Sequence, residues 1–458
     1  MLFTNLTRHT EIGANCYSLE VAGKKVVFDS GMHPRERGLN ALPHFDLLRD
    51  DSADAIFLTH AHHDHLGSLP VLMRRQPHAL AWMSETTRNL AEVMLHNSVN
   101  VMLRQKEEFE LANYPLFSHR EVDQVVKRWR SCPLHQRVSI EGDRLRPDEP
   151  AEVAFEMFDA GHVLGAVGVR IEAEGKKLFY TGDVNFEDQT ISRAARFPEQ
   201  DVDILVIETT RGDSPTPEGY SRATEEQRLA EALKAAFERG GCVIIPVFAL
   251  GKTQEILAMF YEFRRKRLLG NVPIYIGGLS TKLTEIYDKF AHTAPRQKPD
   301  LQILDQVAPF VIAGKSAGET QLQKSRIYAL SSGMMTENTL SHTFARRILS
   351  NPQHSLFFVG YADPISPAGR IRATPPGGSV ALREGEPPIP IQCTIEKFNF
   401  SGHASRESIR AYVNRLRPKK VVLVHGDPNA IEWFRGTLSA DLPESEIIVP
   451  LPGVPLEL

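Results

Sequence analysis

The 458-residue sequence has few cysteines and no long apolar segment. Its four cysteines, Cys16, Cys132, Cys242 and Cys393, are scattered and form no CxxC pair. This spacing argues against a disulfide framework and suits a reducing compartment. No apolar run approaches the roughly 20 residues that a helix needs to cross a bilayer, and no basic and apolar leader opens the chain. We therefore expect a soluble, cytoplasmic protein whose cysteines serve packing.

The sequence also lacks the basic excess of many nucleic-acid-binding proteins. It has 53 lysines and arginines against 57 acidic residues, a net charge of −4. The average charge therefore gives no support for nucleic-acid binding. A site with bound divalent cations could still attract phosphate, because such ions are the largest local charges. Long repeats, low-complexity tracts and heptad arrays are absent as well.

Five short β-branched hydrophobic runs are present, and each ends in a histidine or an acidic residue. They are KKVVFD ending at Asp29, AIFLTH at His60, LFYTGD at Asp183, ILVIE at Glu208 and VVLVH at His425. Runs of this kind predict buried strands, and their terminal polar residues should gather along one edge of a sheet. The sequence thus predicts a metal site at that edge.

The second run continues as HAHHDH, which contains His60, His62, Asp64 and His65. In a turn after a strand, His60 and His62 can point at one ion while Asp64 and His65 face another. A tetrahedral zinc takes about four ligands of this kind, and the chain offers more than four. Further candidates are Asp29, His162, Asp183 and His425. Two ions fit better than one, and ordinary surface or core histidines are the less favoured alternative.

Several segments resemble motifs of a known superfamily. HAHHDHLG, AGHVLGA and YTGDV resemble the metallo-β-lactamase superfamily. VIETT at Glu208, NFSGHAS at His403 and VVLVHGD at His425 resemble the three extra motifs of the β-CASP nucleases, which include ribonuclease J and the endonuclease subunit of the mRNA cleavage and polyadenylation factor. IPVFALGKTQEIL, SSGMMTENTLSHTFARRIL and GYADPISPAGR are similar to the domain that these nucleases insert. The resemblance implies an α/β fold, a metallo-β-lactamase αββα sandwich with an inserted β-CASP domain.

Three parts of the chain are expected from this resemblance and from the order of the apolar segments. Residues 1–210 and 392–458 should form the metallo-β-lactamase domain, and residues 211–391 the β-CASP domain. In the inserted part, apolar strands alternate with helical segments, which implies a parallel sheet flanked by helices. A capping signature at Thr224 and Gln227 predicts that a helix starts there.

The resemblance also implies a site with two zinc ions and a general acid. Seven side chains would hold the ions in two sets that share one carboxylate: His60, His62 and His162 in the first, Asp64, His65 and His425 in the second, and Asp183 in both. The catalytic set would comprise Asp64, Asp29, Glu208 and His403. His403 would protonate the leaving oxygen, Glu208 would orient its ring, and Asp29 would support the site through hydrogen bonds. Paired metals can activate a hydroxide for in-line attack on a phosphodiester. His63 is interpreted as a turn residue.

Substrate contacts are predicted from weaker patterns. Ser332, Gly333 and Met334 follow a predicted strand and begin a predicted helix, where backbone N–H groups and a hydroxyl can hold phosphate. An ordinary loop fits this pattern equally well. Arg370 lies in a segment that resembles the domain interface of the family, and Ser405 follows His403 in its motif. Both are candidate substrate contacts.

The predicted function is that of a zinc-dependent ribonuclease in RNA processing or decay, acting as an endonuclease, a 5′-to-3′ exonuclease or both. RNA is favoured over DNA because the DNA-repair branch of the family lacks a histidine at the motif of His425. The alternatives are a hydrolase of small esters or thioesters, a DNA nuclease and an inactive RNA-binding scaffold. A homodimer is expected because two-fold pairs are the commonest assemblies. Manganese is the alternative metal.

Overall fold

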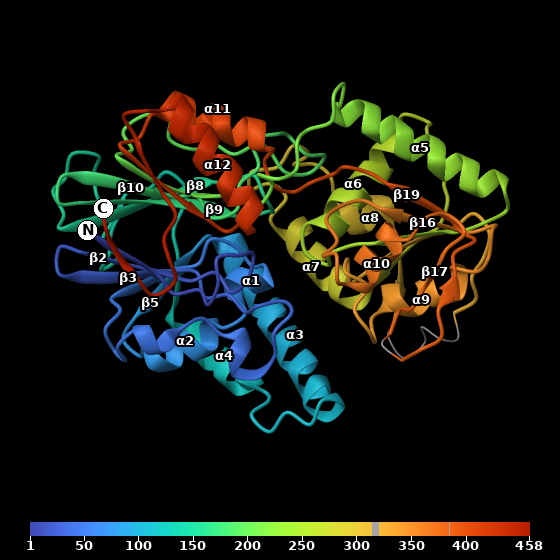
Figure 1. Ribbon diagram of the computed structural model, residues 1–458, viewed down its shortest axis with the longest axis horizontal. Coiled ribbons are helices and arrows are strands. Elements are labelled where there is room, and N and C mark those ends of the chain that lie inside the picture. The colour runs from blue at the N-terminus through green and yellow to red at the C-terminus, as the bar shows by residue number, and fades with distance from the viewer. Residues whose placement is uncertain (314–319, 384) are drawn as a thin grey trace. The chain divides into compact units, whose positions relative to one another are not determined.

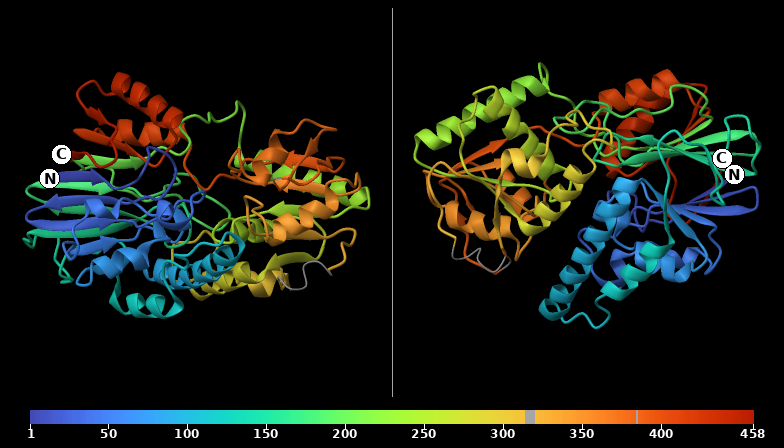
Figure 2. Two further views of the ribbon diagram at one scale, coloured as in Figure 1. Left: turned by 60° about the horizontal axis from the view of Figure 1, so that its bottom comes forward. Right: turned by 180° about the vertical axis from the view of Figure 1, so that it is seen from behind.

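The computed structural model describes residues 1–313, 320–383 and 385–458 and divides the chain into two compact units (Figures 1 and 2). Unit 1 comprises Met1–Asp188, Arg193–Thr216 and His403–Leu458. Unit 2 comprises Gln189–Ser192 and Pro217–Gly402. Unit 1 is therefore discontinuous in sequence.

Unit 1 contains two seven-stranded sheets. The strands of the first sheet are β1 (Leu2–Asn5), β2 (Tyr17–Val21), β3 (Lys24–Phe28), β4 (Ala55–Phe57), β5 (Leu80–Met83), β6 (Trp129–Ser131) and β22 (Pro455–Glu457). Those of the second are β7 (Val138–Ser139), β8 (Val153–Asp159), β9 (Val167–Ala173), β10 (Lys176–Tyr180), β11 (Ile204–Glu208), β20 (Lys420–Val424) and β21 (Glu446–Ile448). The orders are β22-β1-β2-β3-β4-β5-β6 and β21-β20-β11-β10-β9-β8-β7.

The polar ends of the predicted strands come together because of the strand directions. β3 pairs with β4 in parallel, and β10, β11 and β20 are parallel neighbours in the second sheet. Parallel neighbours present their carboxyl ends at the same edge of a sheet. The residues that follow or end these strands therefore lie along one edge of each sheet.

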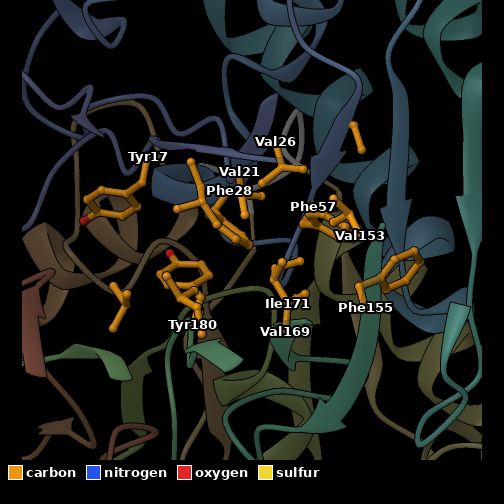
Figure 3. Close-up of a cluster of buried hydrophobic side chains, with 14 of the residues drawn as sticks. Tyr17, Val21, Val26, Phe28, Phe57, Val153, Phe155, Val169, Ile171 and Tyr180 are labelled. Carbon is orange, nitrogen blue, oxygen red and sulfur yellow. The ribbon is translucent and has the colours of Figure 1, made fainter. Parts of the chain in front are cut away.

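One apolar core fills the space between the two sheets (Figure 3). Phe28 and Phe57 from the first sheet face Phe155 and Tyr180 from the second, and the Phe57 and Phe155 rings meet edge to face at 4.8 Å between centroids. Edge-to-face aromatic pairs of this kind add stability beyond their buried area. The strands read as near-continuous hydrophobic runs because both faces of each sheet are covered.

Helices cover the outer faces of both sheets of unit 1 (Figure 1). The helices are α1 (His63–Leu66), α2 (Leu69–Arg75), α3 (Glu85–Glu108), α4 (His119–Val125), α11 (Arg406–Leu416) and α12 (Pro428–Asp441), with short 3₁₀ turns η1 (Gly38–Ala41), η2 (Phe45–Leu47) and η3 (Val126–Arg128). Val413 of α11 and Phe434 of α12 pack on Leu205 and Leu423 of the second sheet. The predicted αββα sandwich is confirmed.

Unit 2 is built on a six-stranded sheet in which every strand pair is parallel. Its strands are β12 (Val243–Pro246), β13 (Ile274–Gly277), β14 (Phe310–Ile312), β15 (Ile327–Leu330), β16 (Ser355–Phe358) and β19 (Thr394–Lys397), in the order β14-β13-β15-β12-β16-β19. Its helices are α5 (Arg222–Glu238), α6 (Lys252–Arg265), α7 (Gly278–Lys289), α8 (Ile303–Val307), α9 (Leu340–Ile348) and α10 (Pro367–Ala373), and β17 (Ser379–Val380) pairs with β18 (Ile389–Pro390). The predicted parallel sheet with flanking helices is confirmed. Within the described residues, no helix is long and apolar enough to cross a membrane.

Three local expectations differ from the structure. Ser221 rather than Thr224 caps α5, because the Ser221 hydroxyl accepts a hydrogen bond from the Thr224 N–H. No helix begins at Ser332: a turn follows β15, and α9 starts only after its N-cap, Thr339. β19 pairs with β16, so unit 2 extends to Gly402 rather than ending near residue 391.

Candidate metal centre

The candidate site lies at the carboxyl ends of the strands of unit 1. Asp29 follows β3, Asp183 lies beyond the end of β10, Glu208 ends β11, and His425 follows β20. The AIFLTH run leaves β4 and enters α1, the helix that carries Asp64 and His65. His162 lies in the turn between β8 and β9. Segments that are far apart in sequence thus converge because neighbouring strands end together.

Backbone geometry at this edge is unusual. Asp29 and His425 have positive φ values of 57° and 49°, a region that costs energy for residues other than glycine. Gly31 lies so close to the start of α1 that a Cβ atom would come within 1.7 Å of the Asp64 carbonyl oxygen. Only glycine allows this approach. The turn after β3 is therefore shaped to bring Asp29 against α1.

Histidine and aspartate side chains form two adjoining sets of metal-ligand type. The first set is His60, His62, His162 and Asp183, and the second is Asp64, His65 and His425. In each set the potential ligand atoms all lie within 4.8 Å of one another. The sets are side by side because Asp183 touches both.

Asp183 presents one carboxylate oxygen to each set. Its Oδ2 lies 3.5 Å from His60 Nε2 and 3.6 Å from His162 Nε2. Its Oδ1 lies 3.3 Å from His65 Nε2 and 2.9 Å from His425 Nδ1. A carboxylate placed in this way has the geometry of a bridge between two cations.

The donor set fits metal ions better than it fits a hydrogen-bond network. His62 Nδ1 lies 3.1 Å from His60 Nε2 and 3.0 Å from His162 Nε2, yet one ring nitrogen has a single proton or a single lone pair. Asp183 Oδ1 and His425 Nε2 are buried and make no well-aligned hydrogen bond, although Oδ1 lies 2.9 Å from His425 Nδ1 and Nε2 lies 3.4 Å from Asp64 Oδ2. Buried polar atoms of this kind need a partner. Cations would supply it, and nitrogen with carboxylate oxygen suits zinc.

Asp29 supports the second set from behind. Its Oδ2 lies 2.8 Å from His65 Nδ1 and accepts a hydrogen bond of 2.7 Å from the Tyr180 hydroxyl. Its Oδ1 accepts a hydrogen bond of 2.8 Å from the Thr59 N–H. A proton held on Nδ1 of His65 leaves Nε2, the atom that faces Asp183, as the ligand atom. Metal-binding histidines are commonly oriented by carboxylates in this way.

A third group joins the carboxylate of Asp183 to Glu208 and His403. His403 Nδ1 lies 3.1 Å and 3.2 Å from the two oxygens of Glu208. Glu208 is 1% exposed, and its Oε1 also accepts a hydrogen bond of 2.7 Å from the Val184 N–H. The carboxylate is thus fixed, and the imidazole that it holds stands beside both metal-ligand sets.

Three family descriptions match this chain in consecutive parts. The metallo-beta-lactamase superfamily matches residues 9–235, the Beta-Casp domain residues 253–371, and the Zn-dependent metallo-hydrolase RNA specificity domain residues 388–450. The chain belongs to the β-CASP family of the metallo-β-lactamase superfamily. The predicted resemblance is confirmed.

Three curated relatives match along nearly the whole chain. Cleavage and polyadenylation specificity factor subunit 3-I of Arabidopsis thaliana is 27% identical over 99% of this chain and 63% of its own length. Cleavage and polyadenylation specificity factor 73 of Drosophila melanogaster is 28% identical over 94% of this chain and 60% of its own length. Endoribonuclease YSH1 of Saccharomyces cerevisiae is 25% identical over 95% and 56%. The chain therefore spans about three fifths of the length of these relatives.

A solved structure, of a protein of unknown function from Enterococcus faecalis V583, has the same fold. It covers 100% of this chain and 99% of its own, with a TM-score of 0.57 and 14% sequence identity. At that identity the likeness concerns the fold alone.

The charges in the β-CASP site set the protonation of its groups. Burial and the neighbouring His65 hold the pKa of His60 well below its usual value, which leaves this imidazole neutral. Burial alone would raise the pKa of Asp183, but the imidazoles of His425 and His65 outweigh it and hold the pKa well below the usual value. His60 and Asp183 thus have the neutral and the ionised form that bind metals. At His65 and His425 burial is outweighed by Asp183 and the other carboxylates, which raise the pKa, so these two imidazoles would release a proton when a metal binds.

The pKa of His403 moves in the opposite direction. Burial opposes its positive charge, but the negative charges of Glu208 and Asp183, with the hydrogen bond to Glu208, outweigh burial and raise the pKa. The imidazole is therefore biased towards its protonated form, as a general acid requires.

Two neighbours of the site were not identified from the sequence. Tyr180 and Thr59 hold Asp29 through their hydroxyl groups, at 2.7 Å for Tyr180 and at 3.0 Å to each oxygen for Thr59. Tyr180 is the last residue of β10 and looks like part of a hydrophobic run. The only signal in the sequence was their closeness to predicted ligands: Thr59 directly precedes His60, and Tyr180 lies three residues before Asp183.

The predicted substrate contacts have local partners. Ser405 is the N-cap of α11, where its hydroxyl accepts a hydrogen bond from the Ser408 N–H. Ser332 Oγ accepts a hydrogen bond from the Thr336 N–H, Gly333 is buried, and Met334 Sδ accepts one from the Asp363 N–H. Arg370 donates to the Leu382 carbonyl. Contact of these five predicted residues with substrate stays a prediction.

His63, interpreted as a turn residue, is the first residue of α1 and belongs to neither metal-ligand set.

Proposed function

We propose that the protein is a two-zinc phosphodiesterase that cleaves RNA. The observation that carries the proposal is the position of Asp183, whose two oxygens face separate histidine sets beside the Glu208 and His403 pair. A carboxylate shared between two ligand sets would hold a pair of metal ions, which many phosphoryl-transfer enzymes use for Lewis-acid chemistry.

In this proposal each residue of the site has one task. One zinc would be held by His60, His62 and His162, the other by Asp64, His65 and His425, and Asp183 would contact both. When bound, zinc would supply Lewis-acid stabilisation of the charge that develops on the phosphate and would lower the pKa of a water molecule. Asp29 keeps His65 in the tautomer that binds metal through Nε2.

His403 would serve as the general acid. Its Nδ1 is held by Glu208, so Nε2 is the atom that would deliver the proton to the leaving oxygen. The negative charge of Glu208 stabilises the imidazolium before the transfer. Protonation of the leaving oxygen matters because an alkoxide is a poor leaving group, and positioned acids contribute about 10²- to 10⁴-fold.

RNA as the substrate is supported by two comparisons. The RNA specificity domain description matches residues 388–450, which include His403 and His425. The YSH1 relatives are named endoribonucleases. We propose endonucleolytic cleavage, with 5′-to-3′ exonuclease action as a second mode. RNA labelled at one end or the other distinguishes the two modes.

The proposal is tested with RNA and single-stranded DNA labelled at the 5′ or the 3′ end. The Asp64→Ala, His65→Ala double variant should lose cleavage and bound zinc together, whereas His78→Ala, at a histidine outside the motifs whose side chain is 83% exposed, should behave as wild type. Internal fragments identify an endonuclease, and mononucleotides from a 5′ label identify an exonuclease. Undiminished cleavage by the double variant, or hydrolysis of model esters without any cleavage of RNA, would refute the proposal.

Metal identity and assembly complete the proposal. Elemental analysis should give two zinc ions per chain, with manganese as the alternative. Sedimentation should give a homodimer, since two-fold pairs are the commonest assemblies. A cytoplasmic location agrees with the four buried free cysteines and would be tested by imaging a tagged chain.

A further inference from the structure

The helices α5 and α6 of unit 2 (Figure 1) each begin with a partly buried charged side chain. Glu255 of α6 is 1% exposed and forms an ion pair with Arg222, the first residue of α5. Lys252, the first residue of α6, carries an amine whose burial lowers its pKa to about 8. We call Arg222, Lys252 and Glu255 the positioning node. None of them belongs to the metal-ligand sets.

The positioning node holds one crossing of the chain between the two units. Gln189–Ser192 belongs to unit 2, whereas the chain before and after it belongs to unit 1. Glu255 Oε1 accepts a hydrogen bond of 2.7 Å from the Thr190 N–H, and Oε2 accepts one of 3.0 Å from the Ile191 N–H. Arg222 donates to the Thr190 hydroxyl at 3.0 Å. This short loop is thus fixed by charge-assisted hydrogen bonds.

The same node holds the crossing that leads to His403. The Lys252 amine donates a hydrogen bond to the Phe400 carbonyl, and the Arg222 guanidinium lies 5.4 Å from the centroid of the Phe400 ring. Unit 2 ends at Gly402, and the next residue is His403. Residues 398–402 therefore form the last held segment before the proposed general acid.

Two further residues near the start of α5 fix the middle of this segment. The Tyr220 hydroxyl donates a hydrogen bond of 2.7 Å to the Asn399 carbonyl. Glu225 Oε1 accepts a hydrogen bond of 2.6 Å from the Asn399 N–H. Both backbone groups of Asn399 are thus occupied by side chains rather than by a neighbouring strand, which sets the path of the chain residue by residue.

Charged groups are a costly way to hold a segment if stability alone is needed. Burying a charge is unfavourable, and apolar residues of similar volume often stabilise equally well or better. Charged and directional contacts instead define one register and one orientation, because they break when a partner shifts by an ångström. A charged node at both crossings, with its carboxylate buried, is expected where backbone position matters for chemistry.

We propose that the positioning node fixes residues 398–402 so that His403 emerges in the orientation that its contact with Glu208 requires. Arg222, Lys252 and Glu255 are then positioning residues for proton transfer to the leaving oxygen. This inference rests on the proposed function, in which His403 is the general acid. Since catalysis depends on geometry, a displacement of about 1 Å can cost up to roughly 10²-fold in rate.

The test compares Glu255→Gln with a matched control on the same helix, Glu262→Gln. Glu262 is 9% exposed and pairs with Arg265 and Lys298, so its variant removes a largely buried charge from α6 away from the crossings. Glu255→Gln should lower kcat for RNA by about 10-fold, with KM and zinc content within about two-fold of wild type. Glu262→Gln should leave all three unchanged.

A second substrate separates positioning of the acid from damage to the metal site. Bis-p-nitrophenyl phosphate has a leaving group of low pKa that needs no general acid. Its turnover should be the same in Glu255→Gln, Lys252→Met and wild type, whereas RNA cleavage should fall in both variants. Equal loss on both substrates in Glu255→Gln would overturn the proposal.

Hydrogen exchange gives a readout that does not depend on activity. The amides of Thr190 and Ile191, which donate to Glu255, should exchange faster in Glu255→Gln than in Glu262→Gln. The amide of Asn399, next to the Phe400 carbonyl that Lys252 holds, should exchange faster in Lys252→Met. Unchanged exchange at these amides would overturn the proposal, as would faster exchange with undiminished kcat for RNA. If His403→Ala cleaved RNA like wild type, the general-acid role in the proposed function would be at fault, and the positioning role would fall with it.

Discussion

Units 1 and 2 are both built on sheets with parallel strands, but they differ in what stands at the strand ends. In unit 1 the strands lead to Asp29, Asp183, Glu208 and His425. In unit 2 the strands β12, β13, β15 and β16 are followed by a valine, a glycine, a serine and a valine. Within the described part of the chain, every group of metal-ligand side chains lies in unit 1. Histidine and acidic residues at the strand ends thus distinguish unit 1, which holds the candidate metal centre, from unit 2.

The largest effect should come from the residue that both metal-ligand sets share. Asp183→Ala removes the carboxylate that faces His60 and His65 and leaves buried imidazoles without their counter-charge. We expect RNA cleavage to fall by roughly 10⁴-fold or more, because charge stabilisation by both metals is lost. Labelled-RNA kinetics and elemental analysis of the same preparation check this. If the variant retained two zinc ions and cleaved RNA at a near-normal rate, Asp183 would not be the shared ligand, and the metal centre would not lie at this edge of unit 1.

The next largest effect should come from Glu208 of unit 1, which affects proton transfer and belongs to neither of the two metal-ligand sets. Glu208→Gln removes the negative charge that raises the pKa of His403. His403 can donate a proton only while protonated, so activity is lost as pH rises through its pKa. A lower pKa therefore moves the alkaline limb of the kcat profile to lower pH, and kcat above neutral pH should fall by roughly 10²-fold.

The profile of Glu208→Gln is measured from pH 5 to 9 with zinc content determined at each end. The control is Glu262→Gln in unit 2, which removes a carboxylate far in sequence from His403 and should leave the limb in place. An alkaline limb at the same pH in Glu208→Gln and wild type would show that this carboxylate does not set the protonation of the acid.

A smaller effect should come from the support behind the second metal-ligand set. Asp29→Asn keeps the shape of the side chain but removes the negative charge of the carboxylate. The Oδ2 atom of that carboxylate accepts hydrogen bonds from His65 Nδ1 and from the Tyr180 hydroxyl. Loss of such a partner typically weakens metal affinity by about 10- to 100-fold. Competition with a chromogenic zinc chelator measures it. One zinc should be released more easily than the other, and equal weakening of both would argue against a specific role at His65.

The sequence predicted the site better than its surroundings, and the physical reasons differ. A histidine or an aspartate at the end of an apolar run is rare, so His60 and Asp183 stood out against their neighbours. Tyr180 ends a similar run, but a tyrosine there is indistinguishable from a core aromatic until its hydroxyl is seen 2.7 Å from Asp29. The contacts of Glu255 were equally invisible, because they join residues far apart in sequence.

Two local sequence patterns in unit 2 gave wrong predictions of where a helix begins. Thr224 followed three residues later by Gln227 looks like a capping box, yet Ser221 caps the helix and Thr224 is already in its first turn. Serine, threonine, aspartate and asparagine all favour an N-cap, so composition alone cannot choose between adjacent candidates. The turn after β15 was misread for the same reason, since a serine and a glycine there resemble a helix start.

The smallest predicted effect concerns the N-cap of α5 in unit 2, which is Ser221 and not Thr224. Ser221→Ala removes the hydroxyl that accepts from the Thr224 N–H, which should cost about 1 kcal/mol of local helix stability. Amides in the first turn of α5 should then exchange about five-fold faster, since 1.4 kcal/mol corresponds to ten-fold. Thr224→Ala retains the capping oxygen of Ser221, so it should change the exchange rate less, and zinc content should be unchanged in both variants.

If Thr224→Ala raised the exchange rate more than Ser221→Ala, Thr224 would be the N-cap after all. Loss of zinc in Ser221→Ala would instead show that unit 2 cannot be altered without disturbing the metal centre, and the contrast between the two units would fail.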